Sequence, residues 1–126
     1  KTNIPVLTTL NGVDLAQDDM HIGFIGTHGN RVANMILNEC DLIVSVGARL
    51  GIRQVGQFNE KFAPNAELVR CDIDEYELSR NIKENEKKYH SGLQKKTVHR
   101  KFTASLIPYK VSAFFLSSVF GVIATR

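Results

Sequence analysis

The sequence of 126 residues has no tryptophan and only two cysteines, Cys40 and Cys71, which do not form a CxxC pair. Two isolated cysteines are too few for a disulfide framework or a cysteine-based zinc site, and they are typical of a reduced compartment. We expect both thiols to be buried in apolar surroundings and unreactive. Neither an HExxH motif nor a Ser/His/Asp order is present, so the sequence does not favour a zinc enzyme or a serine hydrolase.

Long apolar runs are also scarce. The most apolar late stretch, residues 111–125, contains three serines and a glycine. It is shorter than the roughly 20 residues that a membrane-spanning helix needs. The chain does not open with a basic segment followed by an apolar one, as a secretory leader does. The sequence therefore predicts a cytoplasmic protein with no membrane segment.

Positive charge is scarce in the first part of the chain and negative charge in the second. Residues 1–80 carry 7 lysines and arginines against 11 acidic residues, whereas residues 81–126 carry 9 against 2. The net charge of +3 thus comes from the tail, which lacks the interleaved aromatic residues of a nucleic-acid-binding surface. We expect a solvated basic tail and no nucleic-acid partner.

Three apolar runs predict buried strands over residues 4–10, 41–46 and 67–74. Each run is continuous rather than alternating, which suits strands of a parallel sheet that are covered on both faces. A helix is predicted over residues 30–39, where apolar residues recur at spacings of three and four and Asn30 stands at the N-cap position. A second helix is expected over residues 75–86, and residues 51–65 are expected to form a polar loop with one helical turn near residue 60. Strands and helices in this order predict a doubly wound α/β domain.

The segments that follow parallel strands meet at one edge of the sheet, where the ligands of α/β domains bind. Glycines in residues 26–29 and at Gly47 allow a close approach of ligand and backbone, and the helix that begins near Asn30 favours a diphosphate. Arg49 and Arg53 offer hydrogen-bond donors or a flat surface for an aromatic ring. The acids of residues 72–74 can accept hydrogen bonds from ribose or ribityl hydroxyls. Neither GxGxxG nor GxxxxGK(S/T) is present, so the alternative that these are only structural turns stays open.

The sequence predicts no catalytic residue. His28 lies between glycines at the start of a helix, where a single histidine usually packs or forms a hydrogen bond. Glu75 and Glu77 are close in sequence, but neighbouring acids of this kind are usually solvated, so they do not indicate acid-base catalysis.

Four segments of the chain are informative as a set: residues 4–12 (IPVLTTLNG), 26–30 (GTHGN) with Ala33 and Asn34, 41–49 (DLIVSVGAR), and 62–66 (FAPNA) leading to 72–74 (DID). In this order and spacing they resemble the central domain of thiamine diphosphate-dependent enzymes of the acetolactate synthase type. The resemblance extends over about residues 4–82. It implies a Rossmann-like middle domain between a pyrimidine-binding domain and a diphosphate-binding domain.

The resemblance also implies a function. In the full enzyme the two neighbouring domains hold thiamine diphosphate and Mg²⁺, and the reaction is decarboxylation of a 2-keto acid with transfer of the two-carbon unit. The chain alone would be catalytically silent, and the full enzyme is expected to be a homo-oligomer. In acetolactate synthases the middle domain binds FAD. The positions that match the flavin-contacting residues of the family are Thr9, Leu10, Gly26, Thr27, His28, Gly47, Ala48, Arg49, Arg53, Asp72 and Ile73.

The chain also departs from the family pattern. After Arg49 the family usually has an aromatic residue and two acids, whereas this chain has residues 50–52 (LGI), as in acetolactate synthase-like proteins of unassigned substrate. The family's opening strand is expected before Lys1, so the sheet is predicted to be incomplete at its start and the chain to be part of a longer protein. Residues 1–88 are predicted to form a partial central domain, and residues 89–126 a basic and apolar tail that does not match the family. The alternative is a nucleotide-binding or purely structural assembly module without thiamine diphosphate chemistry.

Overall fold

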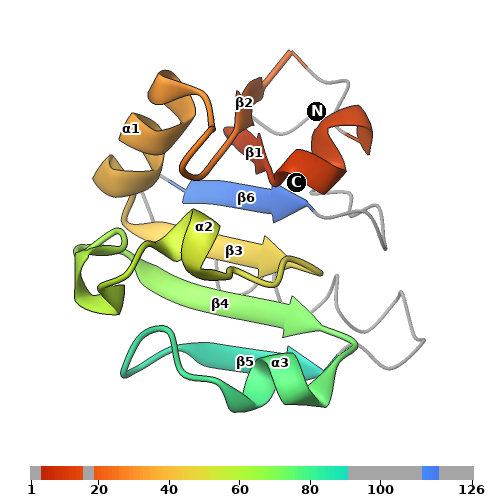
Figure 1. Cartoon of the computed structure of the whole chain (residues 1–126), viewed down its shortest axis with the longest axis vertical. Coiled ribbons are helices and arrows are strands. Elements are labelled where there is room, and N and C mark those ends of the chain that lie inside the picture. Colours follow the sequence, from red (N-terminus) through yellow and green to blue (C-terminus); the bar gives the residue numbers. More distant parts are fainter. Residues whose placement is uncertain (1–3, 16–18, 91–111, 117–126) are drawn as a thin grey trace.

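A single sheet of six strands organises the chain, in a computed structural model that describes residues 4–15, 19–90 and 112–116. All strand pairs are parallel, in the order β2-β1-β6-β3-β4-β5 (Figure 1). The strands are β1 (Val6–Thr8), β2 (His21–Phe24), β3 (Leu42–Val46), β4 (Glu67–Asp72), β5 (Lys87–His90) and β6 (Ser112–Leu116). The predicted α/β class with a parallel sheet is confirmed.

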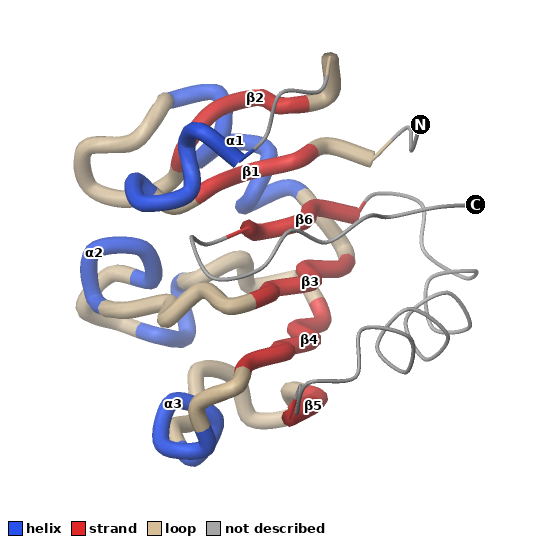
Figure 2. Tube along the Cα trace, turned by 90° about the vertical axis from the view of Figure 1, so that its right-hand side faces the viewer, coloured by secondary structure: helices blue, strands red, loops and turns tan. Residues whose placement is uncertain are grey.

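The described helices cover one side of this sheet. They are α1 (Arg31–Glu39), α2 (Ile52–Val55) and α3 (Glu75–Ser79), and all three lie on the same side in the view of Figure 2. Two short 3-10 turns, η1 (Leu10–Leu15) and η2 (Asn59–Lys61), complete the described elements. No helix among the described residues is long and apolar enough to cross a membrane.

The two faces of the sheet carry separate groups of buried side chains. The larger group includes Ile43 and Leu68 from the central strands together with Ala33 and Leu37 of α1. The smaller group holds Leu42, Val44, Val46, Val69 and Cys71, which alternate with the first group along β3 and β4. Because both faces are buried, β3 and β4 have the continuous apolar runs from which they were predicted.

The predicted helix over residues 30–39 is α1, and its cap is confirmed. The side chain of Asn30 accepts hydrogen bonds from the backbone N–H groups of Val32 (2.8 Å) and Ala33 (3.3 Å). Asn30 thereby satisfies donors that the first turn of a helix leaves unpaired.

The helix predicted over residues 75–86 is wrong in length, because α3 ends at Ser79. Its backbone carbonyls bind a side chain from the sheet instead of later N–H groups of the helix. Arg70 of β4 donates to the carbonyls of Glu77 (2.7 Å) and Arg80 (2.9 Å). The backbone at Arg80 is extended, so the chain leaves the helix at the residue that Arg70 holds.

Strands β2, β5 and β6 were not predicted. The first two are short and have no buried apolar run, which removes the signal that identified β3 and β4. Strand β6 comes from the tail, yet it pairs with β1 on one side and β3 on the other. The direction of the strand order changes at this position, which is where α/β sheets bind ligands. The boundary at residue 88 stays a prediction.

Candidate functional site

The structure places the predicted site residues on the segments that follow four parallel strands. Thr9 and Leu10 follow β1, residues 26–28 follow β2, and residues 47–49 follow β3, while Asp72 ends β4 and Ile73 follows it. Leu10 begins the 3-10 turn η1, and Arg53 lies in α2. Since all strand pairs are parallel, these segments lie at one edge of the sheet, as the sequence predicts.

The loop after β2 is packed closely against α2. The backbone N–H of Thr27 (2.8 Å) and its hydroxyl (3.1 Å) both donate to the carbonyl of Arg53. At Gly26, a Cβ atom would lie 2.6 Å from the same carbonyl oxygen, so only glycine fits there. The loop after β2 is thus joined to α2, which follows β3, through the backbone carbonyl of Arg53. Its side chain is exposed.

Most backbone donors of this loop already have partners inside the chain. Asn34 of α1 accepts from the N–H of Gly26 (3.0 Å) and donates to the carbonyl of Gly26 (3.1 Å). The N–H of Gly29 donates to the carbonyl of Gly26, and that of Asn30 to the carbonyl of Phe24. Among residues 26–30, His28 alone has a backbone N–H with no partner in the described residues. The loop therefore offers a ligand fewer donors than its glycine content suggests.

Replacing Asn34 with alanine is expected to lower the free energy of unfolding by about 2 kcal/mol, because both backbone groups of Gly26 lose a hydrogen-bond partner at a partly buried position. Urea unfolding followed by circular dichroism measures this change. Asn38→Ala, at an exposed position of the same helix, serves as the control and should change stability by less than about 0.5 kcal/mol. Equal losses in the two variants would contradict the role of Asn34.

The turn after β3 is more open. The N–H of Gly47 donates to the carbonyl of Cys71 (2.8 Å), which places this turn beside the end of β4. Gly47 has a φ of 59° and no atom within 4 Å of the place that a Cβ would take. The N–H groups of Ala48 and Arg49 have no partner in the described residues. Leu50 has a φ of 45° and a fully buried side chain, so it turns the chain toward α2.

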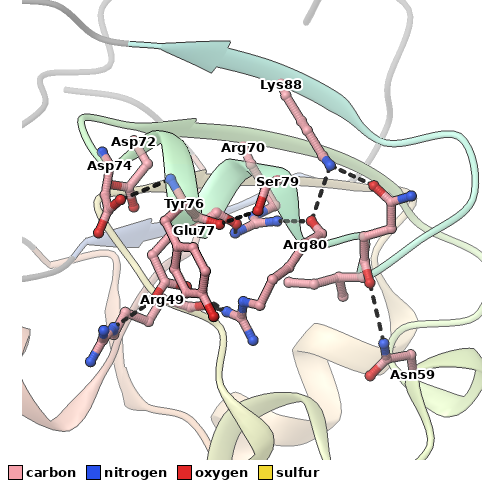
Figure 3. A network of polar contacts seen from close by, with 12 residues as sticks. Arg49, Asn59, Arg70, Asp72, Asp74, Tyr76, Glu77, Ser79, Arg80 and Lys88 are labelled. Atoms are coloured by element: carbon pink, nitrogen blue, oxygen red, sulfur yellow. Dashed lines mark hydrogen bonds and ion pairs between the residues drawn. The ribbon is translucent and has the colours of Figure 1, made fainter.

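Arg49 forms an ion pair that the sequence did not indicate. Its Nε atom donates to Oε1 of Glu77 at 2.8 Å, and Arg80 binds Oε2 of the same carboxylate at 2.6 Å (Figure 3). The Glu77 side chain is 7% exposed, whereas that of Arg49 is 79% exposed. The prediction that Glu77 is solvated is wrong, because the carboxylate lies between two guanidinium groups. Glu75, its neighbour in sequence, is exposed as predicted.

Arg70 of β4 binds the backbone of the helix that carries Glu77. It lies in the apolar run of β4, and its side chain is 2% exposed. Besides the carbonyls of Glu77 and Arg80, it contacts Oε1 of Glu86 at 3.4 Å, and Lys88 contacts the same oxygen at 3.1 Å. A buried charge is tolerated only with such partners. Arg70 therefore fixes α3, and with it Glu77, against the sheet.

Asp72, at the end of β4, and Asp74, at the start of α3, each bind the backbone N–H of the residue two positions later. Oδ1 of Asp72 accepts from the N–H of Asp74 (3.0 Å), and Oδ1 of Asp74 accepts from the N–H of Tyr76 (2.9 Å). Asp72 is buried, while Ile73 and Asp74 are exposed. Each aspartate keeps a second carboxylate oxygen, so both retain the acceptor capacity predicted for a sugar hydroxyl.

The shifted pKa values belong to groups outside the predicted site. Burial raises the pKa of the Cys40 thiol to about 11, so this thiol stays protonated at neutral pH and is a weak nucleophile. Burial lowers the pKa of Lys83, whose ammonium donates to the carbonyls of Ala63 and Ala66. Both cysteines are buried, as the sequence predicts. Within the described ranges no group of three or more potential metal ligands lies together.

Sequence reasoning missed three residues that shape this site: Asn34, Arg70 and Glu77. A signal existed for Arg70, because an arginine inside a buried apolar run requires a buried partner. For Glu77 the signal was its spacing of three residues from Arg80, which on a helix brings the two side chains together. Asn34 lies on the inner side of α1, near the buried Ala33 and Leu37.

A Rossmann-like parallel sheet with candidate site residues at its carboxyl edge defines the class of the domain. The family model of the thiamine pyrophosphate enzyme central domain matches residues 1–90. The chain belongs to this family.

Acetolactate synthases are among the relatives of this chain. The large subunit of acetolactate synthase isozyme 2 from Escherichia coli K12 is 38% identical over 81 residues, which are 63% of this chain and 15% of that protein. The acetolactate synthase large subunit of Porphyra purpurea is 41% identical over 80 residues, 62% of this chain and 13% of that protein. A probable acetolactate synthase large subunit of Methanocaldococcus jannaschii is 37% identical over 82 residues, which are 64% of this chain and 14% of that protein. The matched part of the chain thus spans about 15% of the length of these relatives.

Proposed function

We propose that this central domain binds FAD at the carboxyl edge of its sheet. The observation that carries the proposal is the set of free donors on Arg49. Its guanidinium is exposed and its Nε is bound to Glu77, whereas Nη1 and Nη2 have no partner in the described residues. Beside it lie the open turn at Gly47 and the backbone N–H groups of Ala48 and Arg49. Such donors suit the anionic part of a dinucleotide.

The other predicted residues have roles that fit the same ligand. Leu10 and Ile73 expose apolar side chains at this edge, at 65% and 47%, and these suit a flat aromatic ring. Asp72 retains an acceptor for a ribityl or ribose hydroxyl. From the loop after β2, His28 supplies its backbone N–H, and Gly26 and Thr27 hold the loop against α2. When bound, the flavin has no redox role in the main reaction implied by the family resemblance.

For the whole protein we propose an acetolactate synthase-like enzyme that acts on 2-keto acids. Thiamine diphosphate and Mg²⁺ would be held by pyrimidine-binding and diphosphate-binding domains, and this domain would contribute packing, subunit contacts of a homo-oligomer and the flavin site. The support is the family match together with the names of the relatives. The two buried cysteines, which form no disulfide within the described residues, support a cytoplasmic location. The boundary between a central domain at residues 1–88 and a tail at 89–126 is part of the same proposal.

Replacing Arg49 with alanine is expected to weaken FAD binding about tenfold, because a charge-assisted contact to the ligand is lost. The test is a titration of the full chain with FAD, followed by the absorbance band of the bound flavin and by the melting temperature. Lys87→Ala removes another exposed positive charge, from β5, and should leave the FAD affinity unchanged.

Two results would contradict the proposal. A flat spectrum together with an unchanged melting temperature of the wild-type chain would favour the alternative, a structural assembly module. Unchanged FAD occupancy in the Arg49→Ala variant would remove Arg49 from the site.

A further inference from the structure

Arg49 is held at two separate points, one by α3 and one by the residue that follows α3. Its Nε donates to Oε1 of Glu77 at 2.8 Å, and its backbone carbonyl accepts from Nη2 of Arg80 at 2.6 Å. Nη2 of Arg80 also binds Oε2 of Glu77 at 2.6 Å. Both oxygens of the Glu77 carboxylate therefore bind arginines, and one of these arginines fixes the main chain of the other (Figure 3).

This arrangement is unusual for a side chain as exposed as Arg49. An exposed arginine normally samples many rotamers and loses about 2 kcal/mol of side-chain entropy when a ligand orders it. Here the ion pair to a buried carboxylate orders the guanidinium in advance. Because Nε is the paired atom, the edge of the guanidinium that carries Nη1 and Nη2 remains available for a second partner.

No charged side chain among the described residues pairs with Nη1 or Nη2 of Arg49. Asp72 and Asp74 accept hydrogen bonds from the backbone N–H groups of Asp74 and Tyr76, and Glu75 has no ion pair with Arg49. Glu77 is paired on both oxygens, and Arg80 adds a positive charge to the cluster. The Nη1 and Nη2 atoms of Arg49 thus have no carboxylate partner among the described residues, which suits a ligand with several anionic oxygens.

We propose that Glu77 is the positioning residue that presents Arg49 to the diphosphate of the bound dinucleotide, and that it thereby makes the site prefer FAD to riboflavin. Glu77 does not contact the ligand. It acts through Arg49, and the inference rests on the proposed flavin site. Arg49 then serves as a fork of donors rather than as a surface on which the flavin ring stacks.

A double-mutant cycle on the full chain tests this inference, with FAD and riboflavin as the two probes. Glu77→Gln and Arg49→Ala should each weaken FAD binding about tenfold and leave riboflavin binding unchanged. The double variant should bind FAD no more weakly than Arg49→Ala alone, since both changes remove the same contact. Glu75→Gln makes the same change of charge at an exposed position two residues away and should bind FAD as the wild type does.

Glu77→Asp keeps the charge and should retain part of the preference for FAD, which covers the case in which Glu77→Gln does not fold. Additive losses in the double variant, or equal losses for FAD and riboflavin, would overturn the inference. The first result would mean that Glu77 acts apart from Arg49, and the second that Arg49 stacks on the flavin ring.

A second readout needs no ligand. The Nε–H signal of Arg49 in a ¹H–¹⁵N NMR spectrum should be protected from solvent exchange in the wild type and in Glu75→Gln, and lost in Glu77→Gln. If the wild-type chain binds no flavin, the proposed function fails and the preference for FAD fails with it. The NMR signal then still decides whether Glu77 positions Arg49, and a signal that persists in Glu77→Gln overturns that part as well.

Discussion

Replacing Arg70 with methionine should lower the free energy of unfolding by about 3–5 kcal/mol, the usual loss when one partner of a buried charge pair is removed. The change leaves the carbonyl of Glu77 without its donor and weakens the pairing of Glu86, whose Oε2 already has no hydrogen-bond partner among the described residues. Lys88 still contacts Glu86, so the carboxylate keeps one cation. Urea unfolding of the full chain measures the loss.

The control for this experiment is Lys87→Met. Lys87 forms an ion pair with Glu67 at 3.3 Å in which both side chains are 53% exposed, so its loss should change stability by less than about 1 kcal/mol. If Arg70→Met is no more destabilising than Lys87→Met, Arg70 does not hold α3 against the sheet. A destabilised Arg70→Met variant should also lose the protected Nε–H signal of Arg49, because Glu77 moves with α3.

The second large effect is expected at Gly29. A Cβ atom there would lie 2.5 Å from the carbonyl carbon of Ile25 and 2.6 Å from the carbonyl oxygen of Phe24. Both are backbone atoms and cannot turn aside, so Gly29→Ala must move the loop that follows β2. We expect a loss of about 3 kcal/mol in the free energy of unfolding, at the upper end of what overpacking usually costs.

Gly51→Ala is the matched control for Gly29→Ala. Gly51 has a φ of −75°, and a Cβ there would lie at an ordinary 3.6 Å from the side-chain oxygen of Gln54. Alanine fits this position, so the stability should stay within about 0.5 kcal/mol of the wild type. Comparable losses in both variants would mean that the loop after β2 is less tightly packed than the structure indicates.

The elements predicted well from the sequence are those that a single local pattern determines. Strand β3 has a continuous apolar run, and α1 has both an apolar face and the cap residue Asn30. Strands β2 and β5 lack such runs, because they lie at the two ends of the strand order and carry fewer buried side chains. The place of β6 depends on pairing with β1 and β3, which are distant in sequence, so no local pattern reveals it.

The candidate site, too, could be predicted from the sequence only in part. That residues 26–28, 47–49 and 72–73 share one edge follows from the parallel sheet, so the sequence predicts it. Which of their donors remain available does not follow, since this depends on contacts with residues elsewhere in the chain. Asn34 binds both backbone groups of Gly26, and Glu77 takes the Nε of Arg49. The structure thus moves the emphasis of the site from the glycine loop to Arg49.

The most direct test of the flavin site is a ¹H–¹⁵N NMR map of the full chain as FAD is added. With FAD at this edge, the backbone signals of His28, Ala48 and Arg49 should shift together with the same affinity, because these N–H groups have no partner in the described residues. Signals of Val32 and Met35, exposed on α1, should stay in place. Shifts confined to α1, or none at the three site residues, would contradict a flavin site at the carboxyl edge of the sheet.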